Sequence, residues 1–261
     1  MPPPPGHEPF LRAICEAPDD DAPRLVFADW LDETGDADRA EFVRKHIQLA
    51  RDPEAPSLEA RCQELFRQNW ARWVAELPDT AILWAKLAMP SIGYMPLLFD
   101  SDDQPARMGD TWEENLPSLG DWHHGFPATV YIQGHIAPFL SAAHHIADFV
   151  PVRRVCLHGL DDVDAAIRAL TGTPLLSKVR ELSVKEMYPS DHAAIFLASS
   201  RHATGLRFVS LSAVRMSDRA AAAFAESQYL GGLEMLHLTH NSFSDTARDR
   251  LRARFGFAVH C

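Results

Sequence analysis

Residues 206–211 read LRFVSL, and the same pattern recurs 27 residues earlier as VRELSV (179–184) and 27 residues later as LEMLHL (233–238). A fourth copy, VRRVCL, occupies residues 152–157. In every copy the first, fourth and sixth residues are apolar, and the last two of these point to the same face of a short strand. A register kept over four copies predicts one structural unit stacked on copies of itself, because each unit can bury its apolar edges only against its neighbours.

A helix is expected after each of these strands. An aspartate follows the last apolar position by seven residues in every copy, and a serine precedes it in three of them, as in Ser217-Asp218. Hydroxyl and carboxylate groups cap helix N-termini and face the positive end of the helix dipole. Alanine and a large apolar residue then follow four apart, for example Ala193 and Leu197. One strand and one helix per repeat predict an α/β coil with parallel strands inside and helices outside.

This pattern resembles leucine-rich repeats of the ribonuclease-inhibitor type, and the resemblance implies a short curved solenoid over residues 122–261. In such repeats an asparagine three residues after the last leucine satisfies backbone groups at the bend between strand and loop. Only the last copy has it here, as Asn241, whereas Leu160, Met187 and Val214 occupy the matching positions.

The N-terminal part is predicted to be all helical. Apolar residues at helical spacing, Pro23 at a helix start and Gly35 at a helix end predict four helices. The apolar face of the second helix is expected to include Leu25, Val26 and Phe27. The expected helical ranges are 10–18, 23–35, 38–49 and 57–77.

Part of this region resembles a known family. The stretch DAPRLVFADWLDETGD (21–36), continued by RAEFVR (39–44), is similar to the signature of the bacterial repeat-companion domain. WHHGFP (122–127) resembles the turn through which such proteins enter their first strand. In that family a helical domain precedes leucine-rich repeats, and no enzymatic activity is attached to it. The resemblance implies a helical domain at 1–77 and a solenoid at 122–261, joined by a connecting segment or insertion at 78–121.

Composition restricts the classes of partner. Residues 1–121 carry 24 acidic and 11 basic side chains and residues 122–261 carry 12 and 14, for a net charge of −11. An acidic half argues against nucleic acid, because phosphate binding needs clustered positive charge. No secretory signal and no apolar run of the ~20 residues that span a bilayer is visible, so we expect a cytoplasmic protein without a membrane partner. The four cysteines form no CxxC pair and are expected to be reduced thiols.

Two groups of side chains invite a chemical interpretation. The carboxylates Asp29, Asp32, Glu33, Asp36 and Glu41 could bind a cation, but arginines at helical distance predict ion pairs that hold the turns of the bundle. Histidine pairs occur at 123–124, 144–145 and 237/240, without the HExxH or cysteine pair that would complete a metal site. Phosphate-binding and nucleophile-elbow motifs are also missing from the sequence, so no cofactor and no metal is expected.

The stronger candidate is a surface. Residues between the apolar columns of the strands should point away from the core, onto the concave face of the sheet. Phe208 and Met235 are expected to be neighbours there, as an apolar centre with a polar rim. An ordinary solvated sheet face is the alternative. The predicted interaction surface consists of Arg154, His158, Glu181, Lys185, Phe208, Ser210, Met235 and His237.

The sequence therefore predicts a non-enzymatic scaffold or adaptor that binds a protein partner through its repeats. One alternative is an enzyme whose site lies between the helical domain and the first repeat, with Asp29 or Glu33 acting with His123 or His124. The other alternative is a structural subunit of a larger assembly.

Overall fold

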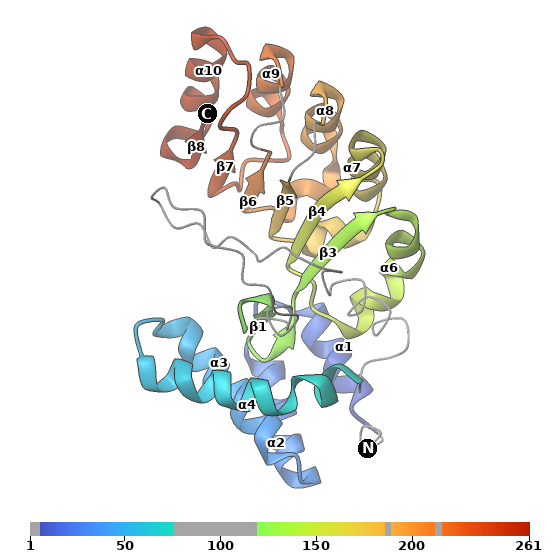
Figure 1. Ribbon diagram of the computed structural model, residues 1–261, viewed down its shortest axis with the longest axis vertical. Coiled ribbons are helices and arrows are strands. Elements are labelled where there is room, and N and C mark those ends of the chain that lie inside the picture. The colour runs from blue at the N-terminus through green and yellow to red at the C-terminus, as the bar shows by residue number, and fades with distance from the viewer. Residues whose placement is uncertain (1–5, 76–118, 186–188, 212–215) are drawn as a thin grey trace, which may run out of the picture.

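The computed structural model describes residues 6–75, 119–185, 189–211 and 216–261. Over these ranges the chain is a mixed α/β protein, with a helical part (residues 6–75) followed by a parallel sheet with helices along one side (the sheet part, residues 122–261). Figure 1 shows the strands as the inner row of an arc and helices α6 to α10 as its outer row. The predictions for residues 76–118 lie outside the described ranges.

The four helices expected in the N-terminal part are present. They are α1 (Glu8–Glu16), α2 (Ala22–Thr34), α3 (Ala37–Arg51) and α4 (Pro56–Ala75). Helix α2 ends at Gly35, whose φ of 93° is left-handed, and the Asp36 side chain caps α3 by accepting from the Arg39 amide. The turn chemistry of the sequence therefore placed the boundary between these two helices correctly.

The apolar face predicted for α2 is wrong at two positions. Leu25 and Val26 are exposed, with 38% and 55% of their surface accessible, whereas Arg24 is fully buried. The Arg24 guanidinium donates to the carbonyl oxygens of Asp20 (2.9 Å) and Pro18 (3.1 Å). Because the buried face is centred on residues 24, 27, 28 and 31, the 100° step of a helix turns residues 25 and 26 toward solvent.

An aromatic hairpin joins the two parts. Strands β1 (Trp122–His123) and β2 (Phe126–Pro127) pair antiparallel, and a short 3-10 helix, η2 (Leu119–Asp121), precedes them. The Trp122 ring lies 5.2 Å from Phe66 in the helical part. Gly125, at a φ of 88°, packs so closely that a Cβ would lie 2.7 Å from Cγ2 of Val43. The WHHGFP turn is therefore inserted among the helices.

The sheet part follows the predicted alternation of strand and helix. Its strands β3 to β8 are all parallel and lie side by side in chain order. The elements are β3 (Thr129–Gly134), α6 (Ala137–Phe149), β4 (Arg154–Leu160), α7 (Val163–Thr171), η3 (Pro174–Lys178), β5 (Glu181–Lys185), α8 (Asp191–Ser199), η4 (Arg201–Gly205), β6 (Phe208–Ser210), α9 (Asp218–Glu226), β7 (Met235–His237), α10 (Asp245–Phe255), η5 (Gly256–Ala258) and β8 (Val259–His260).

The pairing register confirms the period of 27. Val155, Leu182, Val209 and Leu236 pair in one row across β4 to β7, and each is at most 1% exposed. The sheet extends one strand beyond the repeat at each end. Strand β3 pairs Val130 with Val155, and β8 pairs with β7 at the other edge. These two outer strands fall outside the 27-residue period, so the period alone did not predict them.

The serines and aspartates of the helix starts have separate roles. Ser190, Ser217 and Ser244 cap α8, α9 and α10 by accepting backbone amide hydrogens, as predicted. The preceding aspartate of each pair binds across the repeats instead. The Asp191 carboxylate accepts from the Ser217 amide at 2.8 Å, and Asp218 accepts in the same way from Ser244. This aspartate column therefore links each helix start to the next one.

Asn241 has the role that its position predicted. Its side-chain amide donates to the carbonyl oxygens of Leu211 (3.0 Å) and Leu238 (2.9 Å), and its oxygen accepts from the Met216 amide (2.8 Å). One side chain thus satisfies three backbone groups in two adjacent repeats, which a leucine or valine cannot do.

We expect Leu211→Asp to destabilise the protein by more than about 3 kcal/mol, because the carboxylate would replace a fully buried side chain between sheet and helices. Ser210→Asp is the matched control, since Ser210 is a half-buried neighbour on the opposite face of the sheet. Urea unfolding followed by circular dichroism measures both variants. Equal stabilities for the two variants would show that the two faces are assigned incorrectly.

Candidate functional site

The sheet face opposite the helices contains the predicted surface residues. Val155 and Leu157 belong to the core, so Arg154, Cys156 and His158 point to the other side. The neighbouring strands continue these rows, with Arg154 opposite Glu181 and His158 opposite Lys185. The backbone of Lys185 pairs as predicted, but its side chain lies outside the described atoms. The other members of the predicted set are half-buried or exposed, as a contact surface requires.

One end of this face contains a neutralised charge pair. Arg154 Nε donates to Glu181 Oε2 at 2.7 Å, between adjacent strands β4 and β5. Burial by itself lowers the pKa of Arg154, but the Glu181 carboxylate more than offsets it and raises that pKa above its usual value. The pair is therefore charged and locked, and it closes one side of the face with a fixed polar group.

The centre of the face is apolar. Phe208 and Met235 pair directly in the register of β6 and β7. Phe208 is 38% exposed, and Met235 beside it is half-buried. Cross-strand partners of a parallel sheet lie about 4.8 Å apart, so the two side chains form one continuous apolar surface.

Beyond this centre lie a serine and two histidines. Ser210 pairs with His237, and His237 pairs with His260 at the edge strand β8. The imidazole rings of the two histidines are 4.8 Å apart, centroid to centroid. Burial, together with the neighbouring His260, lowers the pKa of His237. Neutral imidazoles and a hydroxyl offer both donors and acceptors, so this border of the face is polar but uncharged.

The opposite half of the face is closed. Cys156 and Ser183 are 6% and 3% exposed, and Ser183 Oγ is a buried atom without a hydrogen-bond partner. Tyr131 donates to Asp121 Oδ1 at 2.8 Å, and burial raises the pKa of its phenol. The accessible part of the predicted surface is thus concentrated around Phe208, Met235 and His237.

The histidines at the junction of the two parts have structural partners. His46 Nδ1 accepts from the Gly125 amide at 3.1 Å, and burial lowers the pKa of His46 to about 4. His124 Nδ1 lies 2.6 Å from Asp21 Oδ1, and its ring stacks on that of His123 at 3.8 Å. Burial also lowers the pKa of His123, to about 2. The carboxylate next to the histidine is thus Asp21, where Asp29 or Glu33 was expected.

The acidic cluster of the helical part is engaged in the ion pairs that its sequence suggested. Arg44 binds Asp29 at 2.6 Å and Asp32 at 2.7 Å. Asp36 binds Arg72 at 2.8 Å, and Glu41 binds Arg61 at 2.7 Å. These pairs join α2 to α3 and α3 to α4, which accounts for the cluster structurally.

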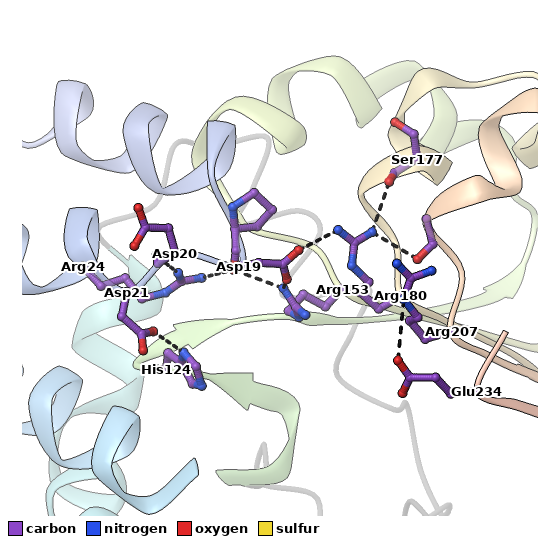
Figure 2. A network of polar contacts seen from close by, with 12 residues as sticks. Asp19, Asp20, Asp21, Arg24, His124, Arg153, Ser177, Arg180, Arg207 and Glu234 are labelled. Atoms are coloured by element: carbon purple, nitrogen blue, oxygen red, sulfur yellow. Dashed lines mark hydrogen bonds and ion pairs between the residues drawn. The ribbon is translucent and has the colours of Figure 1, made fainter. Parts of the chain in front are cut away.

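The strongest polar connection between the two parts was not predicted. Figure 2 shows the Asp19 carboxylate between Arg153 and Arg180. Asp19 Oδ1 accepts from Arg153, and Oδ2 accepts from Arg180 Nη2 at 2.7 Å. Arg153 also donates to the Pro18 carbonyl oxygen at 3.1 Å. One residue at the end of α1 therefore holds the starts of two successive repeats.

The arginines of this network form a column that the sequence does display. Arg153, Arg180 and Arg207 are spaced by 27 residues, next to the apolar columns. Arg180 donates to the Gly205 carbonyl oxygen (3.1 Å) and Arg207 to that of Gly232 (3.2 Å), so each arginine also reaches the following repeat. The period was a usable signal for the column, whereas nothing local marks Asp19 as its partner.

Several other observations bear on function. Within the described ranges, no group of three or more His, Cys, Asp or Glu side chains could hold a metal ion. None of the helices described combines the length and apolar character needed to cross a membrane. No family model, no curated protein and no solved structure matches this chain.

We expect Asp19→Asn to lower the Tm at pH 7 by about 2–4 °C, the effect of an ion pair of roughly 1 kcal/mol at a half-exposed position. The two arginines lower the pKa of Asp19 to about 2, although burial opposes them. Because the folded-state pKa lies below the unfolded value of 3.8, the stabilisation is complete above about pH 5 and is lost as the pH falls toward 2.

Differential scanning calorimetry from pH 7 to pH 2 measures this difference. Asp29→Asn is the control, because it alters an exposed ion pair inside the helical part. A wild-type advantage over Asp19→Asn that persisted unchanged at pH 2 would contradict the assigned pairs.

Proposed function

We propose that this protein is a non-enzymatic scaffold or adaptor that binds a protein partner through the open face of its sheet. In this proposal the sheet part is a short solenoid of leucine-rich-repeat type, and the helical part is a repeat-companion domain that caps its first repeat. The constant register of Val155, Leu182, Val209 and Leu236, the capping serines and Asn241 all support repeats of this kind.

The observation that carries the proposal is the exposed apolar pair in the middle of the open face. Phe208 is one of three large hydrophobic side chains exposed in the described residues, and its register partner is Met235. An exposed aromatic next to a methionine is typical of the centre of a protein interface, where such residues are enriched. A sheet face that only contacts water gains nothing from this pair.

The surroundings of the pair fit an interface rim. Arg154 and Glu181 neutralise each other on one side, so a partner meets no unpaired buried charge there. Ser210 and His237 provide hydrogen-bonding groups on the other side. An apolar centre with polar borders favours a folded protein surface over a nucleic acid, which would need clustered cations.

Packing at the junction supports binding over catalysis. The Gly125 turn is in contact with Val43, His46 accepts a backbone amide, and Asp21 is shared between His124 and Arg51. These histidines and carboxylates have partners that position the hairpin, so their contacts are accounted for by folding.

The double variant Phe208→Ser/Met235→Ser is expected to weaken partner binding at least tenfold, because central apolar anchors commonly contribute about 2 kcal/mol or more. The stability of the protein should change by less than about 1 kcal/mol, since neither side chain is fully buried. The partner is first identified by cross-linking to the full chain and mass spectrometry, and its Kd is then measured by calorimetry.

Val26→Ser is the control, because it removes an equally exposed apolar side chain from the helical part. Binding that Phe208→Ser/Met235→Ser leaves intact, with unchanged circular dichroism, would exclude the sheet face as the interface.

A further inference from the structure

A second exposed apolar site lies on the helical part, away from the sheet face. Of the three large hydrophobic side chains exposed in the part of the chain that the structure describes, Leu25 and Val26 are adjacent on α2. The core beneath them is filled by Phe27, Ala28 and Leu31, which are at most 2% exposed. Leu25 and Val26 therefore have no role in the core of the helical part.

These residues belong to one outward stripe of α2. Positions 22, 25, 26, 29 and 33 follow each other by three or four residues, or are adjacent, so they share one helix face. All five residues are exposed. Ala22, Leu25 and Val26 make the N-terminal half of the stripe apolar, and Asp29 and Glu33 make its C-terminal half acidic.

The acidic half has an excess of negative charge. Asp32 lies beside it, and both Asp29 and Asp32 bind Arg44, yet their side chains remain 71% and 45% exposed. Three carboxylates, those of Asp29, Asp32 and Glu33, thus face one guanidinium, which leaves a net negative charge at the edge of the apolar pair. Such a surface repels an anionic membrane or nucleic acid and attracts a cationic partner.

We infer that the outer face of α2 docks a basic amphipathic helix of another protein. Leu25 and Val26 would receive the apolar side chains of that helix, and Asp29, Asp32 and Glu33 would pair with its lysines or arginines. The stripe from residue 22 to residue 33 is about 16 Å long at 1.5 Å per residue, which matches three turns of a partner helix. Helices in such grooves and on such faces bind through anchors at i, i+3, i+4 and i+7. This surface is independent of the sheet face.

The test uses the full chain and a fluorescein-labelled 18-residue peptide of leucine and lysine, with leucines at i, i+3, i+4 and i+7. A peptide of identical composition, with the leucines spread around the helix, controls for charge alone. Fluorescence anisotropy at 50 mM and 200 mM salt should show the amphipathic peptide binding at least tenfold more tightly than its scrambled control.

Three variants locate the site. Leu25→Ser/Val26→Ser should weaken binding of the amphipathic peptide at least tenfold. Glu33→Gln should weaken it two- to threefold and reduce its salt dependence. Phe208→Ser, which removes the third exposed apolar side chain, should leave it unchanged. Circular dichroism verifies that each variant is folded.

Equal affinity of the two peptides, no binding at 100 μM protein, or full binding by Leu25→Ser/Val26→Ser would each overturn the inference. A dimer in sedimentation velocity that Leu25→Ser/Val26→Ser dissociates would also overturn it, because a second copy would then occupy the face. Loss of peptide binding in Phe208→Ser alone would place the peptide on the sheet face instead.

Discussion

The register of the parallel sheet is the constraint on which the other features of the sheet part depend. Val155, Leu182, Val209 and Leu236 are aligned across four strands, and a slip of one residue would turn each of them to the open face. The same alignment places Phe208 beside Met235 and Arg154 beside Glu181. The surface proposed for partner binding is thus a direct consequence of how the core is buried.

Polar side chains make this register cooperative along the chain. Asp191 and Asp218 each bind the serine that starts the next helix, and Asn241 joins two adjacent bends. On the other side of the strands, Arg180 and Arg207 donate to carbonyl oxygens of the following repeat. Because each link spans one repeat, a disturbance in one unit is transmitted to its neighbour, as expected for stacked units that bury their edges only against each other.

The helical part fixes the first of these units through two kinds of contact. Trp122 and Phe126 insert aromatic rings among the helices, and Asp19 holds the arginines of two successive repeats. Apolar contact gives most of the burial, whereas the Asp19 pairs fix direction, because a carboxylate between two guanidinium groups has few favourable geometries. The open sheet face and the outer face of α2 are consequently held on one connected framework, which suits a protein that brings two partners together.

The sequence by itself determined the features that depend on local spacing: the 27-residue strands and helices, the serine caps, the bend at Asn241 and the end of α2 at Gly35. Periodicity and turn chemistry act over a few residues, so they can be read from the chain. Only the tertiary structure decided that Asp19 binds Arg153 and Arg180, because residues more than 130 positions apart carry no mutual signal. It also decided that Leu25 and Val26 face solvent while Arg24 is buried, since the side of a helix that packs is chosen by its neighbours.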